Sequence, residues 1–114
     1  MFKDEIIAGA NLLDEKLPEW EGRQDLEKLD LASPCNCVLG QSEDERDYWT
    51  TLRKLCPNAQ SEVEIDKFSA SHGFYINDFD EAFVMSEQEV KTYNQLTQEW
   101  KQFITERRKQ NVTV

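Results

Sequence analysis

Residues 86–110 read SEQEVKTYNQLTQEWKQFITERRKQ and contain the longest amphipathic pattern in the chain. Their apolar side chains recur at steps of three and four residues, which places them along one face of an α-helix. Ser86 and Glu89 have the spacing of a capping box, so the helix is predicted to run from Ser86 to about Gln110. Its apolar face consists of Val90, Tyr93, Leu96, Trp100, Phe103 and Ile104. Because three of these side chains are aromatic rings, the rest of the chain is expected to pack against this face.

Two other stretches are predicted to be helices with an apolar face of their own. The first runs from about Phe2 to Leu17, with Pro18 ending it. The second runs from Ser42 to Cys56, with Ser42 and Glu45 as its capping box. Its predicted buried face consists of Tyr48, Trp49, Leu52, Leu55 and Cys56. These two faces are the expected partners of the C-terminal helix.

Shorter elements are predicted between these helices. Asp25 is a plausible cap for a short helical turn, and Ser33 should cap a short buried helix that ends at Gly40. Ser61 and Glu64 form another capping box, which predicts a helix from Ser61 to His72, although Val63 and Ile65 alternate as in a strand.

The stretch 74–85 has β character, so it is expected to be either a small hairpin or an irregular loop. The predicted fold class is therefore mainly α: residues 1–114 form one compact domain of about five helices, with a possible small β-hairpin near 74–85.

The composition indicates a folded and strongly acidic domain. The 114 residues carry a formal net charge of −10, with 39% hydrophobic and 11% aromatic residues. The charge is uneven, because residues 1–89 hold 21 acidic and 8 basic side chains, whereas residues 90–114 hold 2 and 5. Such a surface repels nucleic-acid phosphate and anionic membranes. We therefore expect neither a direct nucleic-acid partner nor a membrane partner.

The N-terminal residues and the cysteines indicate the compartment. Charged side chains interrupt the first 17 residues, so no signal peptide is predicted, and no apolar run is long enough to span a membrane. Three cysteines are an odd number, which argues against a secreted disulfide framework. A cytoplasmic protein with reduced thiols is expected.

Seven carboxylates in the middle of the chain are the main candidates for binding a partner, and we call them the acidic belt. They are Glu43, Asp44, Glu45, Asp47, Glu62, Glu64 and Asp66. A second acidic group, Asp78, Asp80 and Glu81, follows in the next loop. Such carboxylates suit the basic cleft of a partner protein, although acids near helix starts also favour the helix itself. The loop group does not have the spacing of an EF-hand, so it is not predicted to bind a metal.

No catalytic residue, cofactor or metal ligand is predicted. Cys35, Cys37, Cys56 and His72 are the residues that could form a zinc site, but a Cys-x-Cys pair differs from the usual zinc spacing. His72 alone is better explained as part of a helix end. Arg107, Arg108 and Lys109 suit the negative end of the last helix, and three bases are a weak nucleic-acid footprint.

Three segments carry a family resemblance: LLDEKLPEW at 12–20, DLEKLDLAS at 25–33 and CNCVLGQ at 35–41. They resemble a family of small uncharacterised accessory proteins of tailed bacteriophages and prophages of Gram-positive hosts. The HGF step at 72–74 and the Trp100 helix with its two arginines are also similar to that group. The resemblance implies a phage or prophage gene and no catalytic residues.

These observations together predict a phage-encoded acidic protein that works by binding a protein in the host cytoplasm. Its most concrete form is an anti-defence inhibitor that occupies the basic cleft of a host defence or nucleic-acid enzyme. One alternative is a structural or assembly component of the phage particle. Another is a metal-binding regulator that uses the cysteines and His72. The oligomeric state and the identity of the target do not follow from the sequence.

Overall fold

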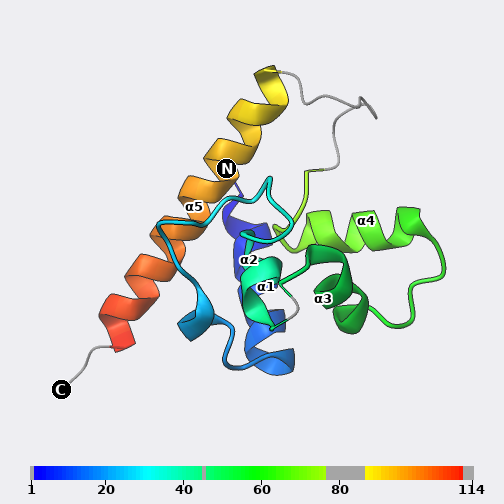
Figure 1. Ribbon diagram of the computed structural model, residues 1–114, viewed down its shortest axis with the longest axis horizontal. Helices are drawn as coiled ribbons and strands as arrows, with labels where there is room; N and C mark the ends of the chain where they lie inside the picture. Colours follow the sequence, from blue (N-terminus) through cyan, green and yellow to red (C-terminus); the bar gives the residue numbers. More distant parts are fainter. Residues whose placement is uncertain (1, 45, 77–86, 112–114) are drawn as a thin grey trace.

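The computed structural model describes residues 2–44, 46–76 and 87–111. These residues form five α-helices and one turn of 3₁₀-helix (Figure 1). In chain order the elements are α1 (Lys3–Lys16), η1 (Glu21–Arg23), α2 (Val38–Ser42), α3 (Tyr48–Leu55), α4 (Glu62–Ser71) and α5 (Glu87–Asn111). No β-strand occurs in the described parts of the chain, and the mainly α prediction is confirmed.

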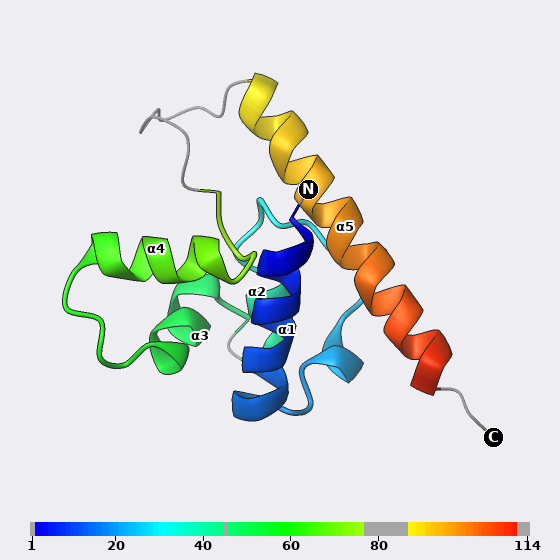
Figure 2. The same ribbon diagram turned by 180° about the vertical axis from the view of Figure 1, so that it is seen from behind.

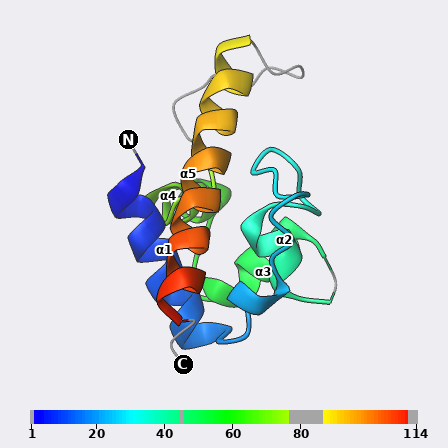
Figure 3. The ribbon, with the colours of Figure 1, turned by 90° about the vertical axis from the view of Figure 1, so that its left-hand side faces the viewer.

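The long helix α5 lies along one side of the molecule, and its N-terminal turns extend beyond the other helices (Figure 1). In the reverse view, α1 lies beside α5, and α4 extends away on the other side of α1 (Figure 2). Figure 3 shows α1 on one side of the lower half of α5, with α2 and α3 on the other. The predicted pairing of the first and last helices is therefore present. The predicted packing of the Tyr48 helix against the last helix is not, because α3 packs mainly against α2 and α4.

The core is organised around Trp100, whose side chain is fully buried. Its ring packs edge-on against Trp20, at 6.0 Å between centroids, and is stacked with Phe74 at 5.9 Å. The indole N–H donates a hydrogen bond of 2.7 Å to the backbone oxygen of Gly73. Leu96, Thr97 and Ile104 complete the buried face of α5. Three segments far apart in sequence therefore meet at one aromatic side chain.

α1 and the end of α4 approach closely enough to require glycine. A Cβ atom at Gly9 would lie only 2.1 Å from the backbone oxygen of His72. Gly73 has a φ of +73°, the left-handed conformation that ends many helices and that glycine adopts without steric cost. Gly73 therefore allows the chain to leave α4 directly after its C-cap, His72.

The ends of α4 and α1 were predicted well because their signals are local. The Ser61 hydroxyl accepts a hydrogen bond from the backbone N–H of Glu64, as the capping box predicts. The Glu64 carboxylate, however, accepts from Gln60 N–H. α1 lies within one residue of its predicted bounds. The start of α5 was assigned to Ser86, which lies outside the described residues, so that cap stays a prediction.

The predicted boundaries between residues 33 and 48 are wrong. α2 begins at Val38, and Gly40 lies inside it instead of ending it. Its N-cap is Cys37, whose sulfur accepts a hydrogen bond from Gly40 N–H. Ser42 does not start the next helix, because it is the last residue of α2 and its hydroxyl donates to the Val38 carbonyl. α3 begins at Tyr48, with the Asp47 carboxylate as its cap.

Two side chains that the sequence predicts to be buried, one aromatic and one aliphatic, are exposed instead. Trp49 is 47% exposed and Val90 is 44% exposed. On α3 the buried positions are Tyr48, Thr51, Leu52 and Leu55, which follow the three- and four-residue steps that Trp49 breaks. Tyr48 packs toward α4 through a hydrogen bond of 2.5 Å between its hydroxyl and that of Ser69.

Two shorter predictions have mixed outcomes. Asp25 accepts a hydrogen bond from Glu27 N–H at a turn, but no helix forms there. Residues 74–76 are neither strand nor helix, and Phe74 and Ile76 are buried. The rest of the possible hairpin, 77–85, lies outside the described residues.

Candidate partner-binding surface

The first half of the acidic belt lies between α2 and α3, where the chain's own bases are in contact with it. Asp44 forms an ion pair with Arg23 of η1, although its side chain is 92% exposed. Glu43 forms an ion pair with Lys54 of α3, and only 17% of its side chain is exposed. Asp47 accepts hydrogen bonds from both the backbone and the hydroxyl of Thr50. Glu43 and Asp47 therefore stabilise the link between the two helices, whereas Asp44 connects this segment to η1.

The pairing with Arg23 affects the acidity of Asp44. A hydrogen bond from the Arg23 guanidinium, together with its positive charge, lowers the pKa of Asp44 below the usual value for an aspartate. Both groups are open to solvent, so the ion pair contributes little to folding. Asp44 therefore stays ionised at neutral pH and accessible to a competing base.

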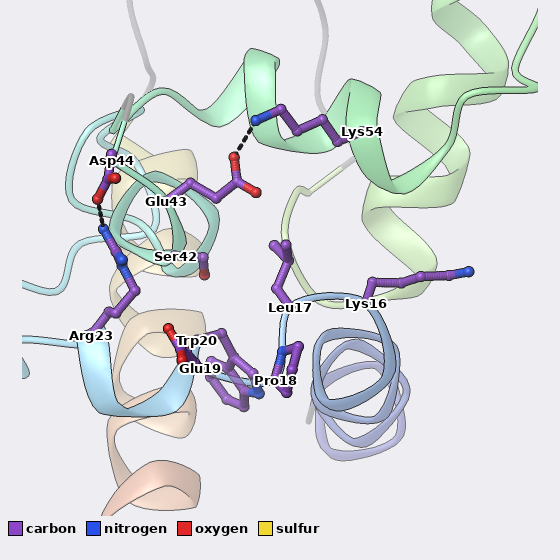
Figure 4. Close-up of a pocket in the computed structure, with 10 residues that line it drawn as sticks. All are labelled: Lys16, Leu17, Pro18, Glu19, Trp20, Arg23, Ser42, Glu43, Asp44 and Lys54. Carbon is purple, nitrogen blue, oxygen red and sulfur yellow. Dashed lines mark hydrogen bonds and ion pairs between the residues drawn. The ribbon is translucent and has the colours of Figure 1, made fainter.

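These residues surround a cleft of about 440 Å³ (Figure 4). One wall is apolar and comes from Leu17, Pro18 and Trp20. The charged lining residues are three bases, Lys16, Arg23 and Lys54, and three acids, Glu19, Glu43 and Asp44. Equal numbers of both signs leave the cleft without a net charge, in contrast to the molecule as a whole.

The second half of the belt lies at the start of α4, away from this cleft. Glu62 and Glu64 are exposed in the first turn of the helix, and Asp66 is half-buried. Acids at this position also suit the positive end of the helix dipole. Glu45, Asp78, Asp80 and Glu81 lie outside the described residues. The acidic belt is therefore two separate groups in space. The group on α4 has the larger number of exposed carboxylates.

The arginines near the end of α5 are part of the fold. Arg107 forms ion pairs with Asp14 of α1 at 3.2 Å and with Glu21 of η1 at 2.9 Å. Its guanidinium also lies 5.7 Å from the ring centroids of Trp20 and Phe103. Arg108 donates to the backbone oxygens of Glu21 and Gln24. These contacts hold η1 against α5, which explains both arginines without a nucleic acid.

The cysteines and His72 occupy different environments. Cys35 is exposed, Cys37 is buried and Cys56 is half-buried, with its thiol donating to the Leu52 carbonyl. His72 lies at the end of α4, where Nδ1 is 2.7 Å from the Phe68 carbonyl oxygen. In the part of the chain that the structure describes, no three His, Cys, Asp or Glu side chains gather as a metal site would require.

The thiols are expected to differ in reactivity. Burial raises the pKa of Cys37 to about 11, although hydrogen bonds from nearby backbone N–H groups oppose the rise. The thiolate is the nucleophilic form of cysteine. Cys37 should therefore react roughly tenfold or more slower than exposed Cys35 at about pH 8. Alkylation followed by peptide mass spectrometry measures the two rates. Unfolded protein, in which both should react readily, is the control, and equal rates in the folded protein would contradict the burial of Cys37.

A further groove lies between α1 and α5 and was not predicted. It has a volume of about 340 Å³ and is lined by Lys3, Ile6, Glu99, Gln102, Phe103 and Glu106. Two of its polar members, Glu99 and Gln102, belong to the face of α5 that the sequence pattern assigns to water. The signal that could have located them is their position beside Phe103, at the border between the apolar and polar faces of the helix.

Glu99 is held in place at this groove. It accepts hydrogen bonds from the backbone N–H of Phe2 at 2.8 Å and from the Gln95 amide at 2.9 Å. Partial burial raises the pKa of Glu99. These two hydrogen bonds, together with a hydrogen bond from the N-terminal ammonium and its positive charge, outweigh burial, so the net pKa lies below the usual value for a glutamate. Glu99 is therefore a carboxylate with a fixed position and a full charge at neutral pH.

Comparisons with known proteins add no family to this description. No protein-family model, no curated protein and no solved structure matches the chain. Among the described residues, no helix is long and apolar enough to cross a membrane.

Proposed function

We propose that this protein acts by binding another protein through its acidic surface. The observation that supports the proposal is the net charge of −10. Residues 1–89 carry 21 acids and 8 bases, which is −13, and residues 90–114 carry 2 acids and 5 bases, which is +3. Arg23, Lys54 and Arg107 already pair with carboxylates of the chain itself. The remaining exposed acids, such as Glu62 on α4, are suited to attract a basic partner.

The resemblance to phage accessory proteins supports a narrower form of this proposal. The protein would then be an inhibitor made in the cytoplasm of a host cell, and its target would be a host defence or nucleic-acid enzyme with a basic cleft. Enzymes that bind nucleic acid present basic surfaces to the phosphates, so a carboxylate-rich protein can compete for the same surface. A catalytic role has no support from the residues described above.

Salt dependence and matched charge changes on α4 test the proposal. The target is first captured from a host lysate and identified, and association is then measured at two salt concentrations. Association should slow as salt rises, because screening acts over about 8–10 Å at physiological ionic strength. Glu62→Lys should slow association, whereas Lys67→Glu on the same helix should speed it. Both residues are exposed, so the melting temperature should change little, apart from the small loss of the favourable dipole interaction at Glu62.

A change in the first half of the belt provides the contrasting control. Glu43→Lys removes the ion pair with Lys54 at a mostly covered position and places two like charges together. This variant should lower the melting temperature as well as any binding. Binding that is insensitive to salt and to both α4 variants would contradict the electrostatic proposal. Gel filtration separates the alternative of a particle component, which would self-associate.

A further inference from the structure

α4 differs from the other α-helices in how little of it is buried. Its one fully buried side chain is the polar Ser69. α1, α2, α3 and α5 each contribute fully buried apolar side chains to the core, whereas α4 contributes none. Ile65 and Phe68 pack against the core from half-buried positions. Among the helices that the structure describes, α4 therefore has the weakest apolar attachment.

The two ends of α4 are attached to the protein differently. Just after its C-terminal end, Phe74 is buried and stacked with Trp100, whose indole N–H donates to the Gly73 carbonyl. Just before its N-terminal end, four of the five residues 57–61 are exposed. Exposure continues in the first turn of the helix, where Val63 is 62% exposed. α4 is thus fixed to the core at its C-terminal end, while its N-terminal end extends into solvent away from α1 (Figure 2).

One buried hydrogen bond connects the last turns of α4 to α3. It joins the hydroxyls of Tyr48 and Ser69, whose oxygens are 2.5 Å apart. This bond must break before α4 can leave α3. A helix of ten residues is too short to persist in water without tertiary contacts. If α4 detaches, its own backbone hydrogen bonds should therefore open as well.

We infer that α4 detaches from α1 and α3 and unfolds as a unit while the core around Trp100 stays folded. The segment that opens extends from the exposed link at 57–61 to His72. It ends at Gly73, because the carbonyl of this residue stays bonded to Trp100. Local unfolding of this kind has a low free-energy cost in elements with few buried apolar contacts. The opening does not depend on the proposed function.

Opening changes what α4 presents to a partner. In the folded helix, Glu62 and Glu64 are held together in the first turn. Unfolding places these carboxylates on a flexible segment and removes the Ser69 partner of the Tyr48 hydroxyl. A partner that binds the folded helix stabilises it by mass action. α4 is therefore an order–disorder switch whose folded fraction can be raised by binding.

Hydrogen exchange of the full chain under native conditions, measured for each amide by nuclear magnetic resonance, tests the inference. After correction for intrinsic rates, the amides of residues 66–71 should exchange about tenfold or more faster than those around Trp100. Low concentrations of urea should accelerate exchange in α4 only slightly, because local opening exposes little surface. The same urea should accelerate exchange around Trp100 strongly, because those amides require global unfolding.

Two substitutions separate local opening from global unfolding. Ile104→Val removes one carbon from a fully buried site on α5, which lies on the other side of α1 from α4 (Figure 2). Because this part of the core stays intact when α4 opens, exchange around Trp100 should accelerate about two- to tenfold and exchange in α4 should not change. Tyr48→Phe removes the bond to Ser69, which both processes break. It should accelerate exchange in both regions by about two- to tenfold.

Three results would overturn the inference. Equal acceleration of α4 and of the Trp100 region by Ile104→Val would show that α4 opens only when the whole protein unfolds. An equal dependence on urea in the two regions would lead to the same conclusion. Exchange in α4 at the rate of an unstructured peptide would show that the closed helix does not form at all.

Discussion

Replacing Trp100 by alanine is expected to lower the free energy of unfolding by about 3–5 kcal/mol. The side chain is fully buried, and it contacts the rings of Trp20, Phe74 and Phe103. Its removal would leave a large cavity at the point where α5, η1 and the segment after α4 meet. It would also leave the Gly73 carbonyl without the indole N–H that donates to it. Chemical denaturation followed by circular dichroism measures the loss.

Two variants separate these contributions. Trp100→Phe keeps an aromatic ring but removes the hydrogen bond to Gly73, so it should cost less than Trp100→Ala. Trp49→Ala removes the same kind of side chain from a half-exposed position and should also cost less. If Trp100→Ala and Trp49→Ala lowered stability equally, the assignment of Trp100 as the centre of the core would be wrong.

Gly40→Ala is expected to destabilise the protein by about 1–3 kcal/mol or more, although alanine favours helices. A Cβ atom at this position would lie 2.3 Å from the Pro34 carbonyl oxygen and 2.7 Å from backbone atoms of Cys35. Backbone atoms cannot move aside as the end of a flexible side chain can. α2 would have to shift away from residues 34–35 to accommodate one methyl group.

Gly22→Ala is the matched control, since a Cβ atom there meets open space. Thermal melts of both variants should show a large shift for Gly40→Ala and little change for Gly22→Ala. Unchanged or higher stability of Gly40→Ala would mean that residues 34–35 do not approach α2 as described. The result also separates a helix-interior glycine from the helix-ending glycine that the sequence suggested.

The long helices could be predicted because their signals are local. In α1 and α5 the apolar period extends over several turns, and in α4 the cap residue and the terminating glycine are adjacent to the helix. These features depend on steric and hydrogen-bonding preferences of neighbouring residues. The pairing of α1 with α5 followed from the same pattern, since each has an apolar face that must be covered.

The segment 33–48 was mispredicted because distant contacts decide its structure. Gln41 donates to the carbonyls of Asp25 and Asn36, and Gln24 donates to that of Val38. These buried amides connect α2 to the preceding loop, so the helix begins where those bonds can form. Ser33, Ser42 and Asp47 all have the character of caps, so the local pattern does not decide between Ser42 and Asp47, and it does not indicate Cys37.

The same division between local signals and distant contacts holds for the candidate site. The sequence by itself determined the excess of carboxylates and the apolar faces that build the helices, since both depend only on which residues are present and in what order. Tertiary structure alone decided which charges remain available, because an ion pair depends on distance in space. Glu43 and Arg107 have partners 11 or more residues away, whereas Glu62 stays exposed. The tertiary structure also created the α1–α5 groove. This groove exists because two helices that are separated by 70 or more residues in the sequence lie side by side.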